Sequence, residues 1–366
     1  MKTRLIFTGG GTGGHIYPNL AIIRELKKQL PDLEVHFIAP REKDLKEIGE
    51  KEEVVTKKII SAKLHRYFTL KNLIIPFNLS IGLAQALIYL SQIKPRAVFL
   101  KGGYGSLPVG LAALMLKIDI FLHESDTYPG LITRVFSKWA KLSFISFKET
   151  KNYIKTTKVK LTGNPIRCFN YSGDNSQAKE ALGVNKNQKM ILILGGSQGS
   201  KEINELVLNT ASSLLVNFSL VHVVGKKKFN QFKEKVKKNI NKKSYKVYPY
   251  LNEDKLSQCY KAADLIISRS GSSLIFEIAQ AGKASILIPL IGAAADHQRK
   301  NAYAYMKTGA CLVIEQPNLK QNIFLEDIKK LLKDKDKIEK MEKSARGFAL
   351  KDAAKDISRL ILKNIS

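Results

Sequence analysis

The sequence is poor in cysteine and contains no residue spacing that binds a structural metal. Cys168, Cys259 and Cys311 lie far apart, and no C-x-x-C pair occurs. This spacing excludes a disulfide framework and a zinc knuckle, and it is typical of proteins in a reducing cytoplasm. His123-Glu124 lacks the second histidine of a metalloprotease motif. We therefore expect no required cofactor; a divalent metal is compatible with the sequence but not indicated by it.

Acidic residues are also scarce. Asp and Glu number 32 against 61 Lys and Arg, so the formal net charge is +29. Such a bias favours anionic partners, which include nucleic acid, an anionic membrane and phosphorylated substrates. The lysines are spread along the chain and no nucleic-acid-binding module is recognisable, so we expect no nucleic-acid partner. Two interpretations of the charge remain: a solvated lysine-rich surface, and attraction to anionic lipid.

A run long and apolar enough to span a membrane is missing as well. Residues 72–93 carry no charge but contain a proline and several polar residues, whereas a spanning helix needs about 20 mostly apolar residues. Leucines at helical spacing in this segment predict a helix with a core-facing stripe. The N-terminal end of this segment, which directly follows Lys71, contains Ile74, Ile75 and Phe77. These apolar residues beside basic ones suit either a patch that lies on an anionic bilayer or a buried loop.

Alternating strand and helix patterns predict two α/β domains, for which 366 residues are sufficient. Strand patterns occur at residues 5–8, 35–39, 97–101, 118–123, 142–146, 190–194, 220–224, 246–248, 265–268, 284–288 and 310–314. Helical patterns occur at about 15–30, 78–92, 107–116, 130–138, 148–155, 201–214 and 321–363. Such βαβ alternation predicts parallel sheets covered by helices on both faces. We therefore expect an α/β fold of two Rossmann-like domains whose parallel sheets face a central cleft.

The domain boundary is expected where this alternation breaks. Gly163-Asn164-Pro165 is a turn signal, because a proline restricts the residue before it. We expect an N-terminal domain at 1–163, a C-terminal domain at 164–345, and a C-terminal helix at 346–366 that packs back towards the N-terminal domain. The first residues, Met1–Arg4, lead directly into a strand pattern and show no signal peptide.

Two glycine-rich loops follow strand patterns and precede helical ones. The first, from Gly9 to Gly14, has five glycines in six positions, and the second runs from Gly195 to Ser200. Glycine lets a ligand approach main-chain N–H groups, and a helix N-terminus adds unpaired N–H groups and the positive end of its dipole. Each loop therefore suits an anion such as a diphosphate; a tight turn without a ligand is the alternative.

A dinucleotide-dependent dehydrogenase would also use such a loop. Its fingerprint requires an Asp or Glu at the end of the second strand, roughly 20 residues after the glycines. Here that strand ends in Ala39-Pro40-Arg41. The missing acid weakens this interpretation, although Arg41 would suit a phosphorylated cofactor.

Four residues near the glycine loops are candidates for chemistry. His15 is either a general base or a helix-capping imidazole. Glu277 either accepts two ribose hydroxyls or is a favourable acid in an early helical turn. Arg167 and Arg269 suit either charge-assisted contacts with phosphate or ion pairs.

Other candidates lie in loops after further strand patterns. Tyr104 and Ser106 are candidates for contact with a second substrate. Glu124 and Asp126 end another strand pattern, where either carboxylate is a base or a structural residue. Gln298 opens a late helix and is a candidate for reading sugar hydroxyls.

Seven motifs occur in the order found in one family. They are Gly9-Gly10-Gly11-Thr12-Gly13-Gly14-His15 with Pro18 and Ala21, Lys101-Gly102-Gly103-Tyr104 with Ser106 and Pro108, His123-Glu124-Ser125-Asp126, Gly163-Asn164-Pro165-Ile166-Arg167, Gly195-Gly196-Ser197-Gln198-Gly199, Ser268-Arg269-Ser270-Gly271 with Glu277, and Asp296 with Gln298 and Asn301. Together they resemble the MurG family of peptidoglycan N-acetylglucosaminyltransferases, over about residues 5–305. The resemblance implies a GT-B fold. It also implies inverting transfer of N-acetylglucosamine from UDP-N-acetylglucosamine to lipid I, which gives lipid II, by direct displacement.

The resemblance assigns roles to residues of both domains. For the donor it implies contacts of the ribose with Glu277, of the diphosphate with Arg167 and the second glycine loop, and of the sugar with Gln298. The full donor set that it implies is Thr12, Gly13, Gly14, Asp126, Arg167, Ser197, Gln198, Leu251, Arg269, Ser272, Glu277, Gln298 and Asn301. The acceptor set is Gly11, Thr12, His15, Gly103, Tyr104 and Ser106, and the catalytic set is His15 and Asp126. The membrane patch is Ile74, Ile75, Phe77 and Lys71, with Lys138, Trp139 and Lys141 adjoining.

The family acts at the cytoplasmic face of the cell membrane. The resemblance therefore implies a peripheral protein on an anionic membrane surface, with partners from cell-wall synthesis and cell division. Two departures leave roles open: many relatives carry Asn where Asp126 stands, and Ser272-Ser273-Leu274 differs from the common Ala-Leu-Thr. Three alternatives remain, namely another UDP-sugar transferase of this fold with a lipid acceptor, a dehydrogenase, and a basic nucleotide- or RNA-binding protein.

Overall fold

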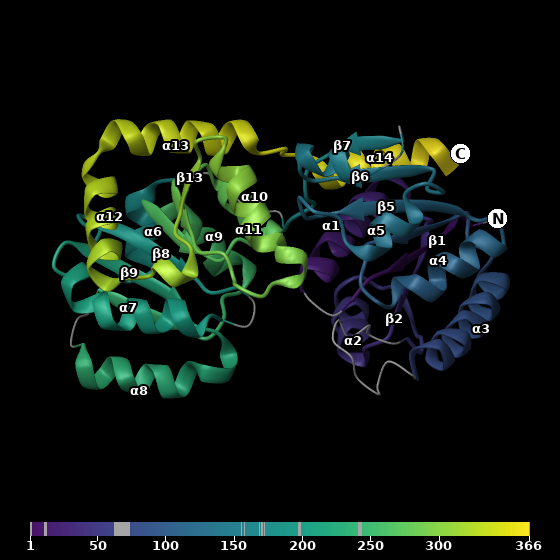
Figure 1. Ribbon diagram of the computed structural model, residues 1–366, viewed down its shortest axis with the longest axis horizontal. Helices are drawn as coiled ribbons and strands as arrows, with labels where there is room; N and C mark the ends of the chain where they lie inside the picture. Colours follow the sequence, from purple (N-terminus) through teal and green to yellow (C-terminus); the bar gives the residue numbers. More distant parts are fainter. Residues whose placement is uncertain are drawn as a thin grey trace. The chain divides into compact units, whose positions relative to one another are not determined.

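The computed structural model divides the chain into two compact units (Figure 1). The first contains Met1–Ile166 together with the C-terminal segment Leu350–Ser366, and the second contains Arg167–Ala349. The structure describes residues 2–10, 13–61, 74–154, 156, 158–167, 169, 171, 173–196, 199–240 and 244–365. The residues from Asn164 to Ile166, which we expected to open the second domain, belong to the first unit.

The first unit is built on a seven-stranded parallel sheet with the order β3-β2-β1-β4-β5-β6-β7. Its strands are β1 (Arg4–Thr8), β2 (Glu34–Ala39), β3 (Val55–Lys58), β4 (Ala97–Leu100), β5 (Asp119–Glu124), β6 (Leu142–Ile145) and β7 (Val159–Leu161). The chain moves outward from β1 through β2 and β3, and then returns to place β4 on the other side of β1. The carboxyl ends of β1 and β4 therefore border the crevice in which doubly wound sheets bind ligands.

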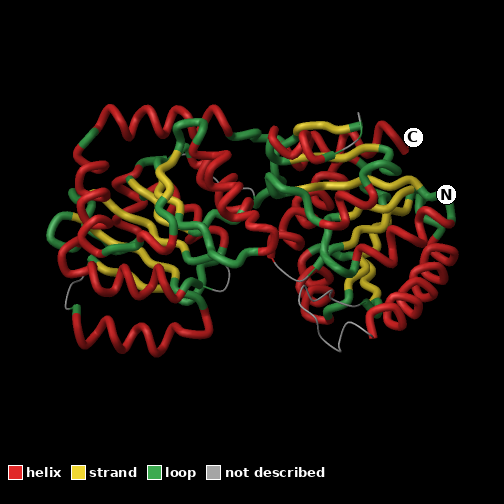
Figure 2. The backbone as a smooth tube through the Cα atoms, in the orientation of Figure 1, coloured by secondary structure: helices red, strands yellow, loops and turns green. Residues whose placement is uncertain are grey.

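Helices cover both faces of this sheet (Figure 2). They are α1 (Gly13–Gln29), α2 (Glu42–Lys51), α3 (Ile75–Ile93), α4 (Ser106–Met115), α5 (Leu131–Phe136), the 3₁₀ helix η2 (Lys148–Tyr153) and α14 (Ala353–Ile365). Alternation along β1 explains the two layers: Leu5 and Phe7 share a cluster with α1 and α14, whereas Ile6 belongs to the cluster of α3 and α4. Because both faces are buried, the strand reads as a continuous apolar run. None of the described helices is both long and apolar enough to cross a bilayer.

The C-terminal helix α14 completes the core of the first unit. It packs against α1, and Ile357 and Ile361 are buried in the same cluster as Ile22 and Leu26. The Ser358 hydroxyl donates to the Ile22 carbonyl oxygen at 3.2 Å. The helical tail that the sequence predicts at 321–363 is therefore three helices, of which only the last belongs to this unit.

The second unit repeats the architecture with six parallel strands in the order β10-β9-β8-β11-β12-β13. Its strands are β8 (Lys189–Leu194), β9 (Phe218–Val223), β10 (Tyr245–Tyr248), β11 (Leu265–Ser268), β12 (Ser285–Leu287) and β13 (Cys311–Val313). Its helices are α6 (Asn175–Ala181), α7 (Lys201–Leu214), η3 (Lys226–Lys228), α8 (Phe229–Asn239), α9 (Glu253–Ala262), α10 (Ser272–Ala281), η4 (Ala294–Asp296), α11 (His297–Met306), η5 (Gln316–Asn318), α12 (Gln321–Lys333) and α13 (Lys335–Phe348). The strand order reverses between β8 and β11, so the loops after these strands border the ligand crevice of this unit.

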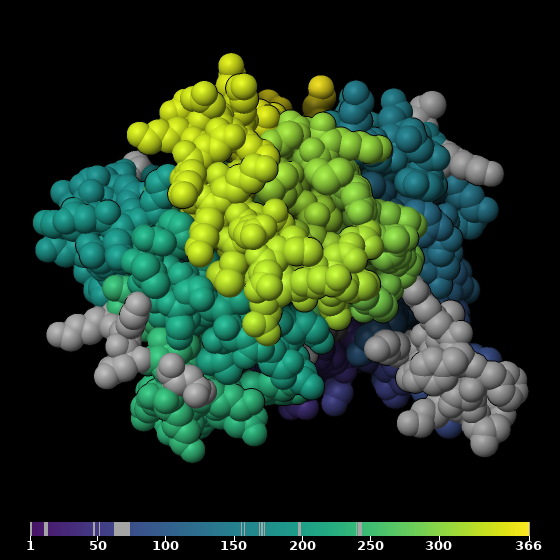
Figure 3. Space-filling model, turned by 60° about the vertical axis from the view of Figure 1, so that its left-hand side comes forward, coloured from purple at the N-terminus to yellow at the C-terminus, as the bar shows by residue number. Residues whose placement is uncertain are grey.

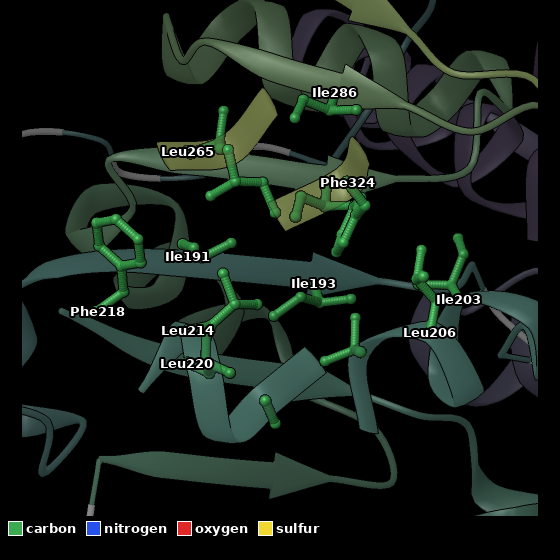
Figure 4. Close-up of a cluster of buried hydrophobic side chains, with 14 of the residues drawn as sticks. Ile191, Ile193, Ile203, Leu206, Leu214, Phe218, Leu220, Leu265, Ile286 and Phe324 are labelled. Carbon is green, nitrogen blue, oxygen red and sulfur yellow. The ribbon is translucent and has the colours of Figure 1, made fainter. Parts of the chain in front are cut away.

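Strand β8 lies in the middle of the core of the second unit. Ile191 and Ile193 point to the face on which α7 contributes Leu206 and α12 contributes Phe324 (Figure 4). Full burial of such a side chain contributes about 1.5–3 kcal/mol relative to exposure. Helix α12 packs against α7, and α13 packs against α10. In the space-filling view the yellow atoms of this part of the chain lie on the surface of the second unit (Figure 3).

The prediction of two Rossmann-like α/β domains with parallel sheets is confirmed. The sequence did not indicate β3 and β7, which are both edge strands. Val55 of β3 and Leu161 of β7 are 47% and 48% exposed, and both strands carry lysine. Lysine on an edge strand discourages pairing with other chains, and it hides the apolar pattern of a strand. The helix predicted at 148–155 is the 3₁₀ helix η2.

Candidate functional site

Polar loops collect at the carboxyl edge of each sheet. In the first unit they follow β1, β4 and β5, and in the second they follow β8, β11 and β12. Two loops in each unit flank the point where the strand order reverses, which is where ligands bind in doubly wound folds. Each unit thus carries one candidate site.

The site of the first unit is centred on His15, in the first turn of α1. Its Nδ1 lies 2.8 Å from the Gly10 carbonyl oxygen. Because a carbonyl oxygen only accepts, Nδ1 carries the proton and Nε2 is the basic nitrogen of the neutral ring. The loop after β4 comes close: a Cβ at Gly103 would lie 2.8 Å from the Gly10 oxygen, and φ there is +80°. Glycine at 103 is therefore required for the two loops to meet.

The surroundings of His15 favour its neutral form. Burial lowers the pKa of His15 most strongly, and the positive charge of Lys101 lowers it further. The hydrogen bond to Gly10 and the carboxylates Asp126 and Asp44 act in the opposite direction, but the pKa stays below its ordinary value. A neutral imidazole near pH 7 is the state that a general base requires.

Lys101 belongs to one of the seven sequence motifs, but no role was predicted for it. It directly follows β4 and is 3% exposed. Its Nζ donates to the Ser125 hydroxyl at 2.6 Å, and that hydroxyl donates to Asn164 Oδ1 at 2.9 Å. Burial lowers the pKa of Lys101 to about 8, against the opposing effect of Glu124 and Asp126. A lysine at the end of an apolar strand, beside a glycine loop, is the signal that would have identified it.

Glu124 holds the loop after β5. Its carboxylate accepts from the N–H groups of Asp126 and Gly130, at 3.0 and 2.8 Å, and from the Thr133 hydroxyl at 2.7 Å. Burial, followed by repulsion from Asp126, raises the pKa of Glu124. With three donors already bound, this carboxylate fixes the shape of the loop that carries Asp126.

His123 is a structural residue as well. Its Nε2 donates to the Gly163 carbonyl oxygen at 3.1 Å, and burial keeps its pKa well below the ordinary value. Asp126 is fixed through its main chain, where its carbonyl oxygen accepts from the Thr150 hydroxyl at 3.0 Å. Its carboxylate acts on the charge of both His15 and Lys101.

The other predicted acceptor residues lie around the loop after β4. The Ser106 hydroxyl donates to the Gly102 carbonyl oxygen at 2.7 Å, at the start of α4. The Tyr104 carbonyl oxygen accepts from the Ser61 hydroxyl at 2.8 Å. Gly13 and Gly14, predicted for the donor, begin α1. The predicted residues that lie outside the described part of the chain are Gly11, Thr12, Lys71, Ser197 and Gln198.

The site of the second unit is organised by Arg269, which directly follows β11. Its buried guanidinium donates to the Ser200 hydroxyl and to Glu202 Oε2, both at 2.7 Å, and to Gln316 Oε1 at 3.0 Å. Two carbonyl oxygens at the end of β12 accept from it at 3.2 Å. The side chain therefore joins the loop after β11 to the segments after β8, β12 and β13, and the main chain of Arg269 is left for the predicted nucleotide contact.

The second glycine loop combines close backbone packing with open space. A Cβ at Gly199 would lie 2.1 Å from the Val224 carbonyl oxygen, and φ there is +77°, so only glycine fits. At Gly196 and Gly271, by contrast, a Cβ would meet no described atom within 4 Å. Gly271 directly precedes α10 and provides no side-chain cap. A helix N-terminus suits a phosphate, because its first N–H groups find no partner within the helix and the positive end of the helix dipole lies there.

Glu277 lies in α10 and is buried. Its Oε1 accepts from Nε and Nη2 of Arg167, at 3.2 and 3.0 Å. Its Oε2 accepts from the Tyr260 hydroxyl at 2.7 Å. The structure therefore brings the predicted donor residues Arg167 and Glu277 together as an ion pair. A carboxylate has about four lone-pair positions, so it can also accept hydroxyl groups.

The remaining predicted donor residues lie at the same edge of the second sheet. Gln298 Oε1 accepts from a main-chain N–H of the preceding loop at 3.1 Å, and its carbonyl oxygen accepts from the Ser270 hydroxyl at 2.8 Å. Asn301 is buried and donates to the Ser270 carbonyl oxygen at 3.5 Å. Ser272 begins α10, and Leu251 follows β10; both are buried.

Of the apolar residues predicted for a membrane patch, two are exposed, whereas Ile75 is half-buried. Ile74 and Phe77, at the start of α3, are 55% and 67% exposed, so neither belongs to a buried loop. Trp139 is 49% exposed, and Lys138 Nζ lies 3.9 Å from the centre of its ring. Lys141 forms an ion pair with Asp119 of the same unit at 2.6 Å.

Within the described ranges, no three His, Cys, Asp or Glu side chains are grouped so that they would hold a metal ion.

Comparison with known proteins decides the family. Residues 5–145 match the glycosyltransferase family 28 N-terminal domain, and residues 190–357 match the glycosyltransferase family 28 C-terminal domain. A relative from Clostridium perfringens (strain SM101 / Type A) is 38% identical over 337 residues, or 92% of each chain. A relative from Clostridium tetani is 35% identical over 364 residues, which are 99% of this chain and 98% of the relative. Both are named UDP-N-acetylglucosamine--N-acetylmuramyl-(pentapeptide) pyrophosphoryl-undecaprenol N-acetylglucosamine transferase.

The solved structure of Acinetobacter baumannii MurG is 25% identical to this chain, with a TM-score of 0.78 and a coverage of 99% of both chains. The chain belongs to the MurG family, within glycosyltransferase family 28. The predicted MurG resemblance and the predicted GT-B glycosyltransferase fold are confirmed.

The electrostatic role of Lys101 can be tested by Lys101→Met, which removes the charge and keeps much of the side-chain volume. Lys101 lowers the pKa of His15, so we expect the variant to raise that pKa and the ring to become protonated at a higher pH. An NMR titration of the His15 ring measures this shift. Lys138→Met, an exposed lysine of the same unit, is the control; an unchanged or lower His15 pKa in Lys101→Met contradicts the assignment.

Proposed function

We propose that this chain transfers N-acetylglucosamine from UDP-N-acetylglucosamine to undecaprenyl-diphospho-N-acetylmuramoyl-pentapeptide, which converts lipid I to lipid II in peptidoglycan synthesis. The observation that carries the proposal is the match to transferases of this name over 92% and 99% of the chain. The chain matches both the N-terminal and the C-terminal domain of glycosyltransferase family 28, which supports the proposal that one unit holds the donor and the other the acceptor.

In this proposal the second unit holds the donor. The open space beside Gly196 and Gly271 supports binding of the diphosphate at the N-termini of α7 and α10. Glu277 accepts the ribose hydroxyls, while Arg167 turns from Glu277 towards the phosphates. The main chain near Leu251 and Arg269 contacts the uracil, and residues of α11 contact the sugar.

The first unit holds the acceptor and supplies the base. Nε2 of His15 removes the proton from the acceptor hydroxyl, and the hydroxyl oxygen attacks the anomeric carbon of N-acetylglucosamine. The bond from that carbon to the diphosphate oxygen breaks, UDP leaves with the electron pair, and the anomeric configuration inverts. General base catalysis of this kind contributes about 10²–10⁴-fold. The Asp126 carboxylate raises the pKa of His15, so it stabilises the imidazolium that forms.

The acceptor carries a membrane lipid, so we also propose peripheral attachment to the cytoplasmic face of the membrane. The exposed Ile74 and Phe77 support insertion between headgroups. The net charge of +29 supports attraction to anionic lipid.

Transfer of radiolabel from UDP-N-acetylglucosamine to a lipid I analogue by the purified protein tests the reaction. We expect a labelled lipid II analogue and free UDP. UDP-glucose and UDP-galactose in parallel test the sugar, because equal use of either would favour another transferase of the same fold. No labelled product with a folded, UDP-binding protein would overturn the proposal.

In the same assay, His15→Ala is expected to lose transfer and to keep its affinity for UDP.

The role of Glu277 is tested by the affinity of Glu277→Ala for UDP. The variant loses the acceptor of two ribose hydroxyls, each worth about 1.5–3 kcal/mol when bound to a charged group, so we expect the Kd to rise by at least roughly 100-fold. Isothermal titration calorimetry gives the Kd. Glu326→Ala, at an exposed site on α12 of the same unit, is the control. An unchanged Kd in folded Glu277→Ala would remove this residue from the donor site.

A further inference from the structure

A buried tyrosine lies directly behind the carboxylate of Glu277. Tyr260, on α9, is fully buried. Its hydroxyl donates to Glu277 Oε2 at 2.7 Å, within the range of charge-assisted hydrogen bonds. Burial, followed by the charge of Glu277, raises the pKa of Tyr260 well above its ordinary value. The hydroxyl therefore keeps its proton and serves the carboxylate as a donor.

Aromatic packing holds this tyrosine in place. The ring of Tyr260 lies 5.5 Å from that of Phe169 and 6.2 Å from that of Tyr171, measured between centroids. The Tyr171 hydroxyl donates to the Glu277 carbonyl oxygen at 3.3 Å, and the Arg167 guanidinium lies 5.1 Å from the Phe169 ring. Glu277 is thus held at its main chain and at both carboxylate oxygens, by residues from α9 and from the segment after Ile166.

The two carboxylate oxygens of Glu277 have partners of different kinds. Oε2 is bound by a fully buried hydroxyl, whereas Oε1 is bound by Arg167, whose side chain is 13% exposed. A ligand that offers its own hydroxyls and an anionic group can compete for Oε1 and for Arg167 together. It cannot compete for Oε2 without displacing a core tyrosine, so Oε2 is the fixed end of the carboxylate.

We propose that Tyr260 is a positioning residue for nucleotide recognition: it anchors Oε2 of Glu277 so that the carboxylate presents Oε1 to the two ribose hydroxyls of the donor when Arg167 leaves. The proposal rests on the ribose-binding role proposed for Glu277. A matched control exists in the same unit. Tyr305 is also fully buried, and its hydroxyl has no hydrogen-bond partner among the described residues.

The test compares Tyr260→Phe, Tyr305→Phe and Glu277→Ala in calorimetric titrations with UDP and with 2′,3′-dideoxy-UDP, which lacks both ribose hydroxyls. We expect the unsubstituted protein to prefer UDP. In Tyr260→Phe we expect the preference, measured as the ratio of the two Kd values, to fall about tenfold. The affinity for UDP should decrease, and the affinity for the dideoxy nucleotide should not. Tyr305→Phe should keep the affinity for both. If the role of Tyr260 were purely structural, Tyr260→Phe would weaken the binding of UDP and of the dideoxy nucleotide equally.

The outcomes separate this inference from the proposed function. If Glu277→Ala loses the preference and folded Tyr260→Phe keeps it, Tyr260 does not position the carboxylate. If Glu277→Ala keeps the preference, the ribose role of Glu277 itself is wrong. If Tyr260→Phe does not fold, an NMR titration takes the place of calorimetry on this variant. It follows the Tyr260 Cζ resonance in ¹³C-labelled unsubstituted protein. That resonance should shift on addition of UDP and not of the dideoxy nucleotide, and no shift with UDP overturns the inference.

Discussion

The carboxyl ends of parallel strands meet at one edge of a sheet, and both candidate sites depend on this constraint. It places the loops after β1 and β4 side by side in the first unit, and those after β8 and β11 in the second. Glycines then decide how close the loops can come. Gly103 lets one loop touch the Gly10 carbonyl oxygen, and Gly199 lets another pass the Val224 carbonyl oxygen. Residues far apart in the sequence thereby share a site.

Buried charges are the second common feature of the two sites. An isolated buried charge is costly, so each is paired or hydrogen-bonded. In the first unit, Lys101 lies among Ser125, Glu124 and Asp126, and its charge helps to keep His15 neutral. In the second, the Arg269 guanidinium is hydrogen-bonded to the segments that follow β8, β12 and β13.

In the proposed function, the Arg167–Glu277 ion pair differs from the contacts of Arg269 because Arg167 and Glu277 exchange partners when the nucleotide binds. Arg167 contacts Glu277 through one carboxylate oxygen only, and both side chains are predicted to contact the nucleotide. A ligand with hydroxyls and phosphates supplies a replacement for each member. The cost of separating two buried charges is then offset by new charge-assisted hydrogen bonds.

The sequence predicted the elements whose apolar patterns are strong. Strands such as β1 and β8 are buried on both faces, so their composition alone identifies them, and the glycine loops after them follow directly. The edge strands β3 and β7 were missed because their lysines face solvent. The partners of Glu277 were missed for a different reason. Arg167 lies 110 residues away and Tyr260 17 residues away, and only the packing of α9 beside α10 reveals the second contact.

We propose that the nucleotide binds to the second unit, although the more glycine-rich loop lies in the first. Hydrogen–deuterium exchange with and without saturating UDP tests this most directly. We expect UDP to slow exchange in peptides that cover β8 to the start of α7 and β11 to α10, and to leave the peptides of β1 and α1 unchanged. Protection confined to β1 and α1 would contradict the account and would assign the nucleotide to the loop of His15.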